Sequence, residues 1–301
     1  MVSSLRFIHG PLPCKPVRIA LPPKQWFFFM RFLALLYLAF LVLTAQGFGQ
    51  VIVAHRGASH DAPENTLAAF RLAWEQGSDG VEGDFYLTKD NQIVCIHDRD
   101  TNRTAGVKRV VEDSTFAELR ELDYGGWKDR RWKGEKIPTF AEVLRTVPAG
   151  KLFVIELKSK QKIVPVLASQ LRELDTQGID LLIISFDAAT VAACRQQIPD
   201  VRAHWLTSFS QPRGAKGFEP TADSIARTVR ETRASGVGMK GQRQVVNADF
   251  ILDLKRHGCS EFHVWTIDAL QDAEYFQELG AYGITTNRPA LIGKIRDVVA
   301  P

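Results

Sequence analysis

The sequence has 301 residues, of which 45% are hydrophobic and 24% are charged. This composition excludes a disordered or collagen-like chain and is typical of a globular protein. The formal net charge of +4 comes from residues 1–49, which hold five basic and no acidic residues, whereas the rest of the chain carries 33 basic and 34 acidic residues. The near-neutral remainder has no basic stripe, so we expect no nucleic-acid partner.

Residues 1–49 are expected to form a leader. An uncharged apolar run from Leu33 to Leu43 follows Arg31 and precedes small and polar residues, which is the pattern of a secretory signal. The run is shorter than the roughly 20 apolar residues of a membrane span. Cleavage near Gly47 would release a periplasmic or extracellular protein, and Met30 is a candidate for the true start. A membrane anchor formed by an uncleaved leader is the alternative.

From residue 50 onward, apolar β-type runs alternate with amphipathic helical patterns. The expected strands are Val51–Ala54, Gly80–Tyr86, Leu152–Leu157, Leu181–Phe186, Arg202–Leu206, Gly236–Met239, Glu261–Thr266 and Gly283–Thr286. The expected helices are Glu64–Glu75, Phe140–Val147, Ile163–Leu174, Ala188–Gln197, Asp223–Ala234, Ala248–His257, Leu270–Leu279 and Pro289–Val298.

This alternation predicts an α/β protein with a (β/α)8 TIM barrel in a single catalytic domain, residues 50–301. Several expected strands are apolar throughout, as strands covered on both faces should be. A doubly wound open sheet is the alternative, but no glycine-rich dinucleotide loop follows the first strand.

Residues 99–138 interrupt the alternation. They are charged and rich in turn residues, and they fall between the second and third expected barrel strands. We interpret them as a loop-rich insertion above the barrel mouth, since long insertions are often functional. A solvated cap without a catalytic role is the alternative.

Two acidic side chains occur on one expected strand. Glu82 and Asp84 are two residues apart, so they share a face. Two buried carboxylates on one face repel each other and lose hydration unless a cation compensates. A hard divalent cation prefers oxygen ligands. The pair therefore predicts a metal site.

A hairpin should bring a histidine to this pair. Asp90 and Asn91 form a good two-residue turn, because both tolerate positive φ. A turn centred there pairs Lys89 with Gln92 and places Asp84 opposite His97. A bulge would shift this register by one residue.

Further polar side chains end two other expected strands, where barrel enzymes place catalytic groups. His55 and Arg56 follow the first strand, and Glu156 and Lys158 share a face at the end of the third. Three carboxylates suit Ca²⁺ or Mg²⁺. Arginine and lysine suit a phosphate, and two histidines can act as general acid and general base. The inventory predicts metal-assisted cleavage of a phosphoryl ester.

These residues resemble those of the glycerophosphodiester phosphodiesterase family over most of residues 51–292. The motifs that carry the resemblance are HRG (55–57), PENT (63–66), EGDFYLTKDNQIVCIHD (82–98), IELK (155–158), ISF (184–186), VWTID (264–268) and GITTNRP (283–289). The family often has Asp where Asn287 stands and Asn where Asp268 stands. Those two departures put substrate detail in doubt more than activity.

The resemblance implies a role for each matched residue. His55 and His97 would be the acid–base pair, and the metal ligands would be Glu82, Asp84 and Glu156. Phosphate would be contacted by Arg56 and Lys158, while the remaining substrate-binding residues of the mouth would be Glu64, Asn65, Phe186 and Trp265.

The implied reaction converts a glycerophosphodiester to sn-glycerol 3-phosphate and an alcohol. One alternative is phospholipase D-like hydrolysis of lysophospholipids by the same residues, and another is a non-catalytic module that binds an anion. Two further histidines, His204 and His263, fall within strand runs and are expected to pack or bond locally. Cys95, Cys194 and Cys259 show no zinc pattern and are expected to be small buried side chains.

Overall fold

The computed structural model describes residues 50–214 and 216–298. The predicted leader lies outside the described residues. Within them, no helix is long and apolar enough to cross a membrane. The three cysteines of the described part are free and buried, as predicted.

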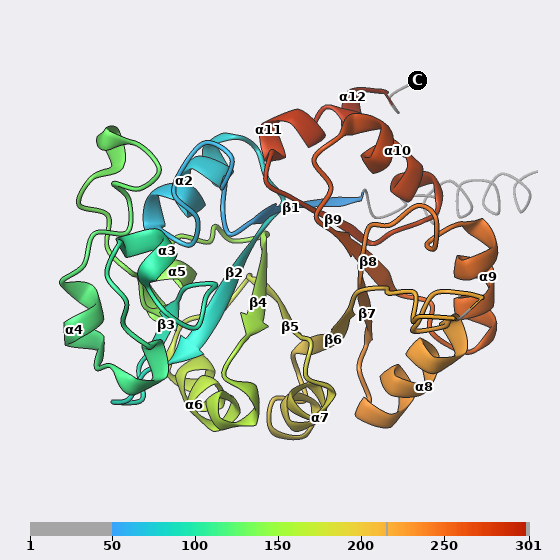
Figure 1. Cartoon of the computed structure of the whole chain (residues 1–301), viewed down its shortest axis with the longest axis horizontal. Helices are drawn as coiled ribbons and strands as arrows, with labels where there is room; N and C mark the ends of the chain where they lie inside the picture. The colour runs from blue at the N-terminus through green and yellow to red at the C-terminus, as the bar shows by residue number, and fades with distance from the viewer. Residues whose placement is uncertain (1–49, 215, 299–301) are drawn as a thin grey trace, which may run out of the picture. The chain divides into compact units, whose positions relative to one another are not determined.

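Eight parallel strands close into a barrel, which confirms the predicted fold class (Figure 1). The barrel strands are β1 (Val51–His55), β2 (Gly80–Leu87), β4 (Leu152–Leu157), β5 (Asp180–Ser185), β6 (Arg202–Thr207), β7 (Gly236–Lys240), β8 (Phe262–Trp265) and β9 (Gly283–Thr286). Pairing of β1 with both β9 and β2 closes the ring. A short strand, β3 (Ile93–Cys95), pairs antiparallel with β2 outside the ring.

Helices cover the outside of the barrel (Figure 1). They are α2 (Leu67–Glu75), α5 (Phe140–Leu144), α6 (Val164–Glu173), α7 (Ala188–Gln197), α8 (Ala222–Thr232), α9 (Ala248–Arg256), α10 (Leu270–Glu278), α11 (Pro289–Ile292) and α12 (Ile295–Val298), with the 3-10 helix η3 (Lys160–Ile163) before α6. The last predicted helix is therefore divided in two.

The first predicted helix begins three residues later than expected. Thr66 caps α2 by accepting a hydrogen bond from the Ala69 backbone N–H, and Asn65 has a left-handed φ of 58°. Both features end helical geometry before Leu67. As a result Glu64 and Asn65 lie in a loop, from which their side chains reach the barrel mouth.

The predicted hairpin register is wrong by one residue. Phe85 pairs with Cys95, and the Asp84 carbonyl accepts a hydrogen bond from the Ile96 backbone N–H. The loop has three residues rather than two, because Asn91 adopts a φ of 61° and Thr88 pairs with Gln92. His97 is therefore not directly opposite Asp84.

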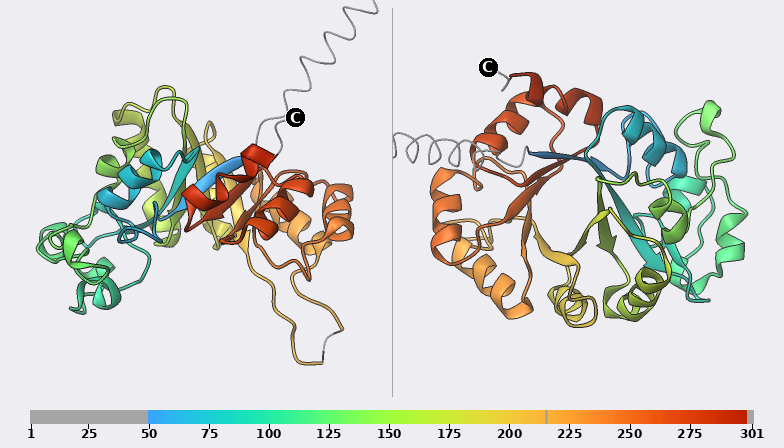
Figure 2. Two further views of the ribbon diagram at one scale, coloured as in Figure 1. Left: turned by 90° about the horizontal axis from the view of Figure 1, so that it is seen from above. Right: turned by 180° about the vertical axis from the view of Figure 1, so that it is seen from behind.

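The insertion, residues 99–138, packs around its own small core and stands at one side of the barrel (Figure 2). It contains α3 (Asn102–Ala105), η1 (Val111–Asp113), α4 (Phe116–Arg120) and η2 (Arg130–Trp132). Val111, Leu119, Tyr124 and Ile137 pack there against Val94 and Ile96 of the hairpin. This shared core fixes the insertion to β3, which pairs with the strand that carries Glu82 and Asp84.

Candidate active site

Three carboxylates meet at the carboxyl ends of β2 and β4. Asp84 and Glu156 are partners in the parallel register, and Glu82 precedes Asp84 on the same face. All three are buried, and one oxygen from each lies within 4.8 Å of the others. Burial, followed by the charges of Asp84 and Glu156, raises the pKa of Glu82 well above its ordinary value. Burial, followed by Asp84, raises the pKa of Glu156 to about 7.

The cluster fits a divalent cation. Glu82 accepts a hydrogen bond from the Arg56 backbone N–H through one oxygen at 3.0 Å. Its other oxygen, Oε1, is buried and has no hydrogen-bond partner among the described residues. A buried polar atom without a partner is costly, and carboxylate oxygens are the ligands that Ca²⁺ and Mg²⁺ prefer.

Two basic side chains offset part of the negative charge. Arg56 Nε lies 3.1 Å from Asp84 Oδ2, and Lys158 Nζ lies 3.0 Å from Asp84 Oδ1 and 2.6 Å from Glu156. Burial alone would raise the pKa of Asp84, but Lys158 and Arg56 hold it well below its ordinary value. Asp84 is therefore the most firmly ionised of the three carboxylates.

The loop before α2 supports this arrangement. Asn65 donates from Nδ2 to Asp84 Oδ2 at 2.8 Å and accepts at Oδ1 from the Asp84 backbone N–H at 3.2 Å. Glu64 accepts from Arg56 at 2.9 Å. Thus both predicted residues lie at the site, where they hold Asp84 and Arg56 in place.

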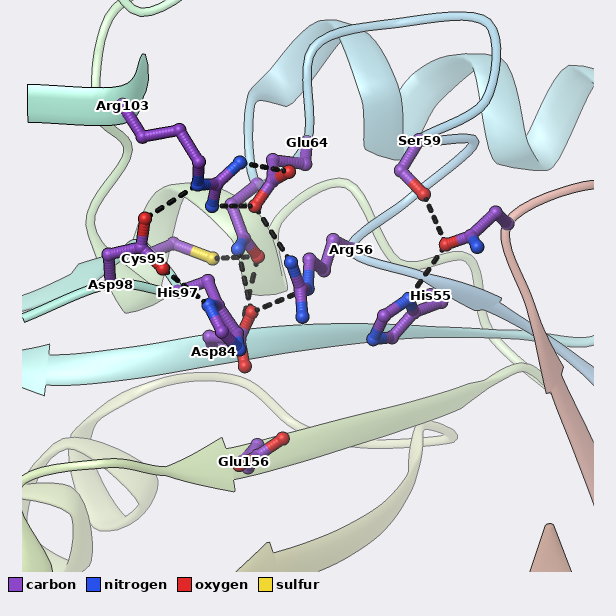
Figure 3. Close-up of polar contacts among 12 residues, drawn as sticks. His55, Arg56, Ser59, Glu64, Asp84, Cys95, His97, Asp98, Arg103 and Glu156 are labelled. Carbon is purple, nitrogen blue, oxygen red and sulfur yellow. Dashed lines mark hydrogen bonds and ion pairs between the residues drawn. The ribbon is translucent and has the colours of Figure 1, made fainter. Parts of the chain in front are cut away.

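The insertion contributes a residue that sequence reasoning missed. Arg103 of α3 donates to both oxygens of Glu64 at 2.8 Å and to Asp98 at 2.6 Å (Figure 3). Nothing in the sequence around Arg103 distinguishes it from the other basic residues of the insertion. Its contacts show that the insertion is tied to the site rather than forming a separate solvated cap.

Each predicted catalytic histidine is anchored through Nδ1. His97 Nδ1 lies 2.7 Å from Asp98 Oδ1, and His55 Nδ1 lies 2.7 Å from Asn287 Oδ1. Burial, followed by the positive charge of Arg56, lowers the pKa of His55 to about 4. In both rings Nε2 is the nitrogen left for a ligand.

The two family departures are in direct contact with each other. Asn287 donates from Nδ2 to Asp268 Oδ2 at 2.7 Å, and Asp268 also accepts from the Asn287 backbone N–H at 2.8 Å. The amide and the carboxylate thus form one hydrogen-bonded pair. As a result His55 faces an amide oxygen.

A pocket of about 150 Å³ opens onto these groups. Eight of the eleven predicted site residues line it, namely His55, Arg56, Glu82, His97, Glu156, Lys158, Phe186 and Trp265. The rings of Phe186 and Trp265 meet edge to face with centroids 5.4 Å apart. Glu64, Asn65 and Asp84 stand behind the lining residues. The structure therefore brings the whole predicted set together.

A family model described as the glycerophosphoryl diester phosphodiesterase family matches residues 55–291. The chain belongs to this family. Its members are phosphoric diester hydrolases, and so is this protein. A glycerophosphodiester phosphodiesterase from Caldanaerobacter subterraneus is 30% identical over 251 residues, covering 82% of this chain and 98% of that protein. Another from Bacillus altitudinis is 29% identical over 259 residues, covering 82% and 98%.

Solved structures share the fold. An Oleispira antarctica phosphodiesterase in complex with the product sn-glycerol-3-phosphate is 24% identical, has a TM-score of 0.74, and covers 83% of this chain and 98% of its own. This similarity independently supports the TIM barrel.

Proposed function

We propose that the protein hydrolyses glycerophosphodiesters to sn-glycerol 3-phosphate and an alcohol, with a divalent cation and two histidines. The observation that carries this proposal is the convergence of three buried carboxylates, two basic side chains and two anchored histidines on one pocket. The sn-glycerol-3-phosphate bound to the Oleispira antarctica phosphodiesterase supports the choice of product.

Glu82, Asp84 and Glu156 would hold the cation. A bound Ca²⁺ or Mg²⁺ ion would take up negative charge on the phosphate oxygens. Arg56 and Lys158, which border both the carboxylates and the pocket, would bind the phosphate itself. Phosphate binding and carboxylate pairing would thus share the same two side chains.

His55 and His97 would transfer protons at Nε2. One would take a proton from the nucleophile, either water or the neighbouring glycerol hydroxyl, as its oxygen bonds to phosphorus, and the other would give a proton to the alcohol oxygen as its bond to phosphorus breaks. If the glycerol hydroxyl attacks first, a water molecule would then open the cyclic phosphate. Their Nδ1 contacts with Asn287 and Asp98 fix the orientation of each ring. Phe186 and Trp265 would contact the apolar side of the glycerol or the alcohol.

Export is a second part of the proposal, and it rests on the leader pattern alone. We propose that cleavage near Gly47 releases the barrel outside the cytoplasm. N-terminal sequencing of the protein recovered from its producing cells tests this. A mature chain that still begins before Leu33 would contradict it.

The activity is tested on protein stripped with EDTA and then supplied with Ca²⁺ or Mg²⁺. We expect hydrolysis of glycerophosphocholine, glycerophosphoethanolamine or glycerophosphoglycerol only when the metal is restored. Lysophosphatidylcholine serves as the competing substrate. Faster hydrolysis of that lipid would favour the phospholipase D-like alternative, and full turnover in excess chelator would refute the metal assignment.

A further inference from the structure

A hydrogen-bonded chain of side chains crosses the barrel interior beside the candidate active site. His204 of β6 is completely buried, and its Nε2 lies 2.7 Å from Glu261 Oε1. Its Nδ1 lies 2.9 Å from Nδ1 of His263 on β8. The two rings are stacked with centroids 5.2 Å apart. Neither histidine belongs to the proposed acid–base pair.

Glycines on the intervening strand make room for these rings. On β7, which lies between β6 and β8 (Figure 1), Gly236 and Gly238 face the histidines. A Cβ atom on Gly238 would lie 2.4 Å from both Cε1 and Nε2 of His263, and one on Gly236 would lie 2.9 Å from His204 Nε2. Glycine at these two positions therefore leaves the space that the histidine rings occupy, and we call this space the glycine cradle. Any larger residue would place a Cβ atom in it.

The chain of contacts fixes the tautomer of both rings. The hydrogen bond from His204 lowers the pKa of Glu261, so Glu261 is an ionised acceptor and His204 Nε2 must carry the proton. Burial lowers the pKa of His204, which leaves its Nδ1 as an acceptor. His263 Nδ1 must then donate. Since burial keeps His263 neutral as well, its Nε2 is a hydrogen-bond acceptor.

The side chain that carries this acceptor lines the pocket. His263 lines the pocket two residues before Trp265 on the same face of β8, so it lies one layer deeper in the barrel. Among the described residues, His263 Nε2 has no hydrogen-bond partner. Thr285 lines the same pocket, and its hydroxyl is also unpartnered within the described part of the chain. Ile184 and Leu206 complete an otherwise apolar floor.

We propose that this floor is a hydroxyl-binding subsite, in which His263 Nε2 accepts a hydrogen bond from a free hydroxyl of the substrate's glycerol. Glu261 and His204 act as positioning residues, because they hold His263 in the tautomer that presents an acceptor. The proposal rests on the proposed function and names which part of the substrate is recognised. The pocket volume of about 150 Å³ is roughly ten times what one ordered water requires, so it accommodates several heavy atoms.

The subsite discriminates a polyol ester from an alkyl ester of the same phosphate. Binding of sn-glycerol 3-phosphate is compared with binding of n-propyl phosphate, which lacks both hydroxyls, by calorimetry in the presence of Ca²⁺ or Mg²⁺. One buried neutral hydrogen bond contributes up to about tenfold in affinity. We expect sn-glycerol 3-phosphate to bind the wild type more tightly than n-propyl phosphate, and His263→Phe to lower this affinity ratio by about tenfold while the binding of n-propyl phosphate stays unchanged.

A second measurement uses the unaltered protein. Hydrogen bonding changes the ¹⁵N chemical shift of an imidazole acceptor nitrogen. We expect His263 Nε2 to shift when sn-glycerol 3-phosphate is added and not when n-propyl phosphate is added. An equal response to both ligands, or the same affinity ratio in His263→Phe as in the wild type, would overturn the proposal.

The positioning role has its own controls. Glu261→Ala should reduce the affinity ratio, whereas Glu261→Gln, which can still accept from His204, should preserve it. Glu261 also pairs with Arg202 at 3.0 Å. Asp180 is the other carboxylate partner of Arg202, at 2.9 Å, and it contacts no histidine among the described residues. Asp180→Ala should therefore leave the affinity ratio unchanged. A ratio lowered equally by Asp180→Ala would refute the positioning role. A wild-type protein that hydrolyses no glycerophosphodiester would contradict the proposed function. That result alone would leave the subsite untouched, because the affinity ratio is measured by binding and requires no turnover.

Discussion

Two clusters of ionisable groups occupy the barrel, and they are completed in different ways. On β2 and β4, three carboxylates face two basic side chains, and Glu82 Oε1 has no hydrogen-bond partner within the described chain. His204 of β6 and His263 of β8 form a hydrogen-bonded chain with Glu261, the residue before β8. Among the described residues, His263 Nε2 is the end of this chain and has no partner.

The difference indicates which of the two clusters depends on a bound ligand such as a cation. The three buried carboxylates cannot all be ionised together without a high cost unless a cation joins them. The histidine cluster needs no added charge, because burial keeps both rings neutral. The first cluster should therefore respond to metal, and the second should respond to changes in packing.

The largest effect should follow loss of a proposed metal ligand. Residues that only support a ligand already cost about 10- to 100-fold when removed, so Glu82→Ala should lower kcat/KM by more than about 100-fold. Added metal should not restore the activity. Circular dichroism should show that the variant stays folded. Activity within tenfold of the wild type would contradict the ligand assignment.

Loss of a catalytic histidine should come next. His97→Ala removes a proposed proton-transfer group, and such groups contribute about 10²- to 10⁴-fold to the rate. The matched control is His60→Ala, because the exposed side chain of His60 pairs with neighbouring Asp61 and is not among the residues that line the pocket. We expect a decrease in kcat only for His97→Ala, measured with glycerophosphocholine. Equal rates in the two variants would contradict the role of His97.

Packing should control the histidine cluster. Gly238→Ala places a Cβ atom against the His263 ring, and overpacking of this kind costs about 1–3 kcal/mol in the free energy of unfolding. At Gly217 an added Cβ meets nothing within 4 Å, so Gly217→Ala should stay within about 0.5 kcal/mol. Urea denaturation measures both. Similar values for the two variants would show that the glycine cradle is not required.

The smallest effect is expected at the hydrogen-bonded pair of Asn287 and Asp268 beside His55. Asn287→Asp alone would place two carboxylates in contact and destabilise the fold by about 1–2 kcal/mol. Adding Asp268→Asn should recover that stability and leave a carboxylate on His55. The pKa of His55, now about 4, should then rise, because a negative charge favours the protonated ring.

NMR titration of the metal-free protein measures this shift. The lowered pKa means that the folded wild type binds fewer protons than the unfolded chain. The free energy of unfolding is therefore not reduced by His55 above pH 6.5, and it decreases as the pH falls from 6.5 toward 4. The double variant should lose less stability over that range. An unchanged pKa of His55 would show that Asn287 does not control it.

Local patterns were enough to predict the barrel and the carboxylate cluster. Strand ends follow from apolar runs, and Glu82 and Asp84 share a face by the two-residue period of a strand. The hairpin register was missed because left-handed geometry at Asn91 lengthens the loop by one residue. That choice depends on tertiary contacts as well as on the turn residues.

Contacts between distant segments were beyond the sequence. His204 and His263 are 59 residues apart and were expected only to bond locally. Their pairing depends on glycines of the strand between them, which have no distinguishing pattern of their own. The same holds for Arg103, which reaches Glu64 across 39 residues.

The central claim is that the carboxylate cluster is incomplete without a divalent cation. The most direct test is the thermal midpoint of unfolding of metal-stripped protein as Ca²⁺ or Mg²⁺ is added. A ligand that binds only the folded state raises this midpoint in proportion to the logarithm of its concentration. We predict such a rise for the wild type and none for Glu82→Gln, which should also be the more stable of the two without metal. A wild-type midpoint that does not respond to either ion would contradict the account.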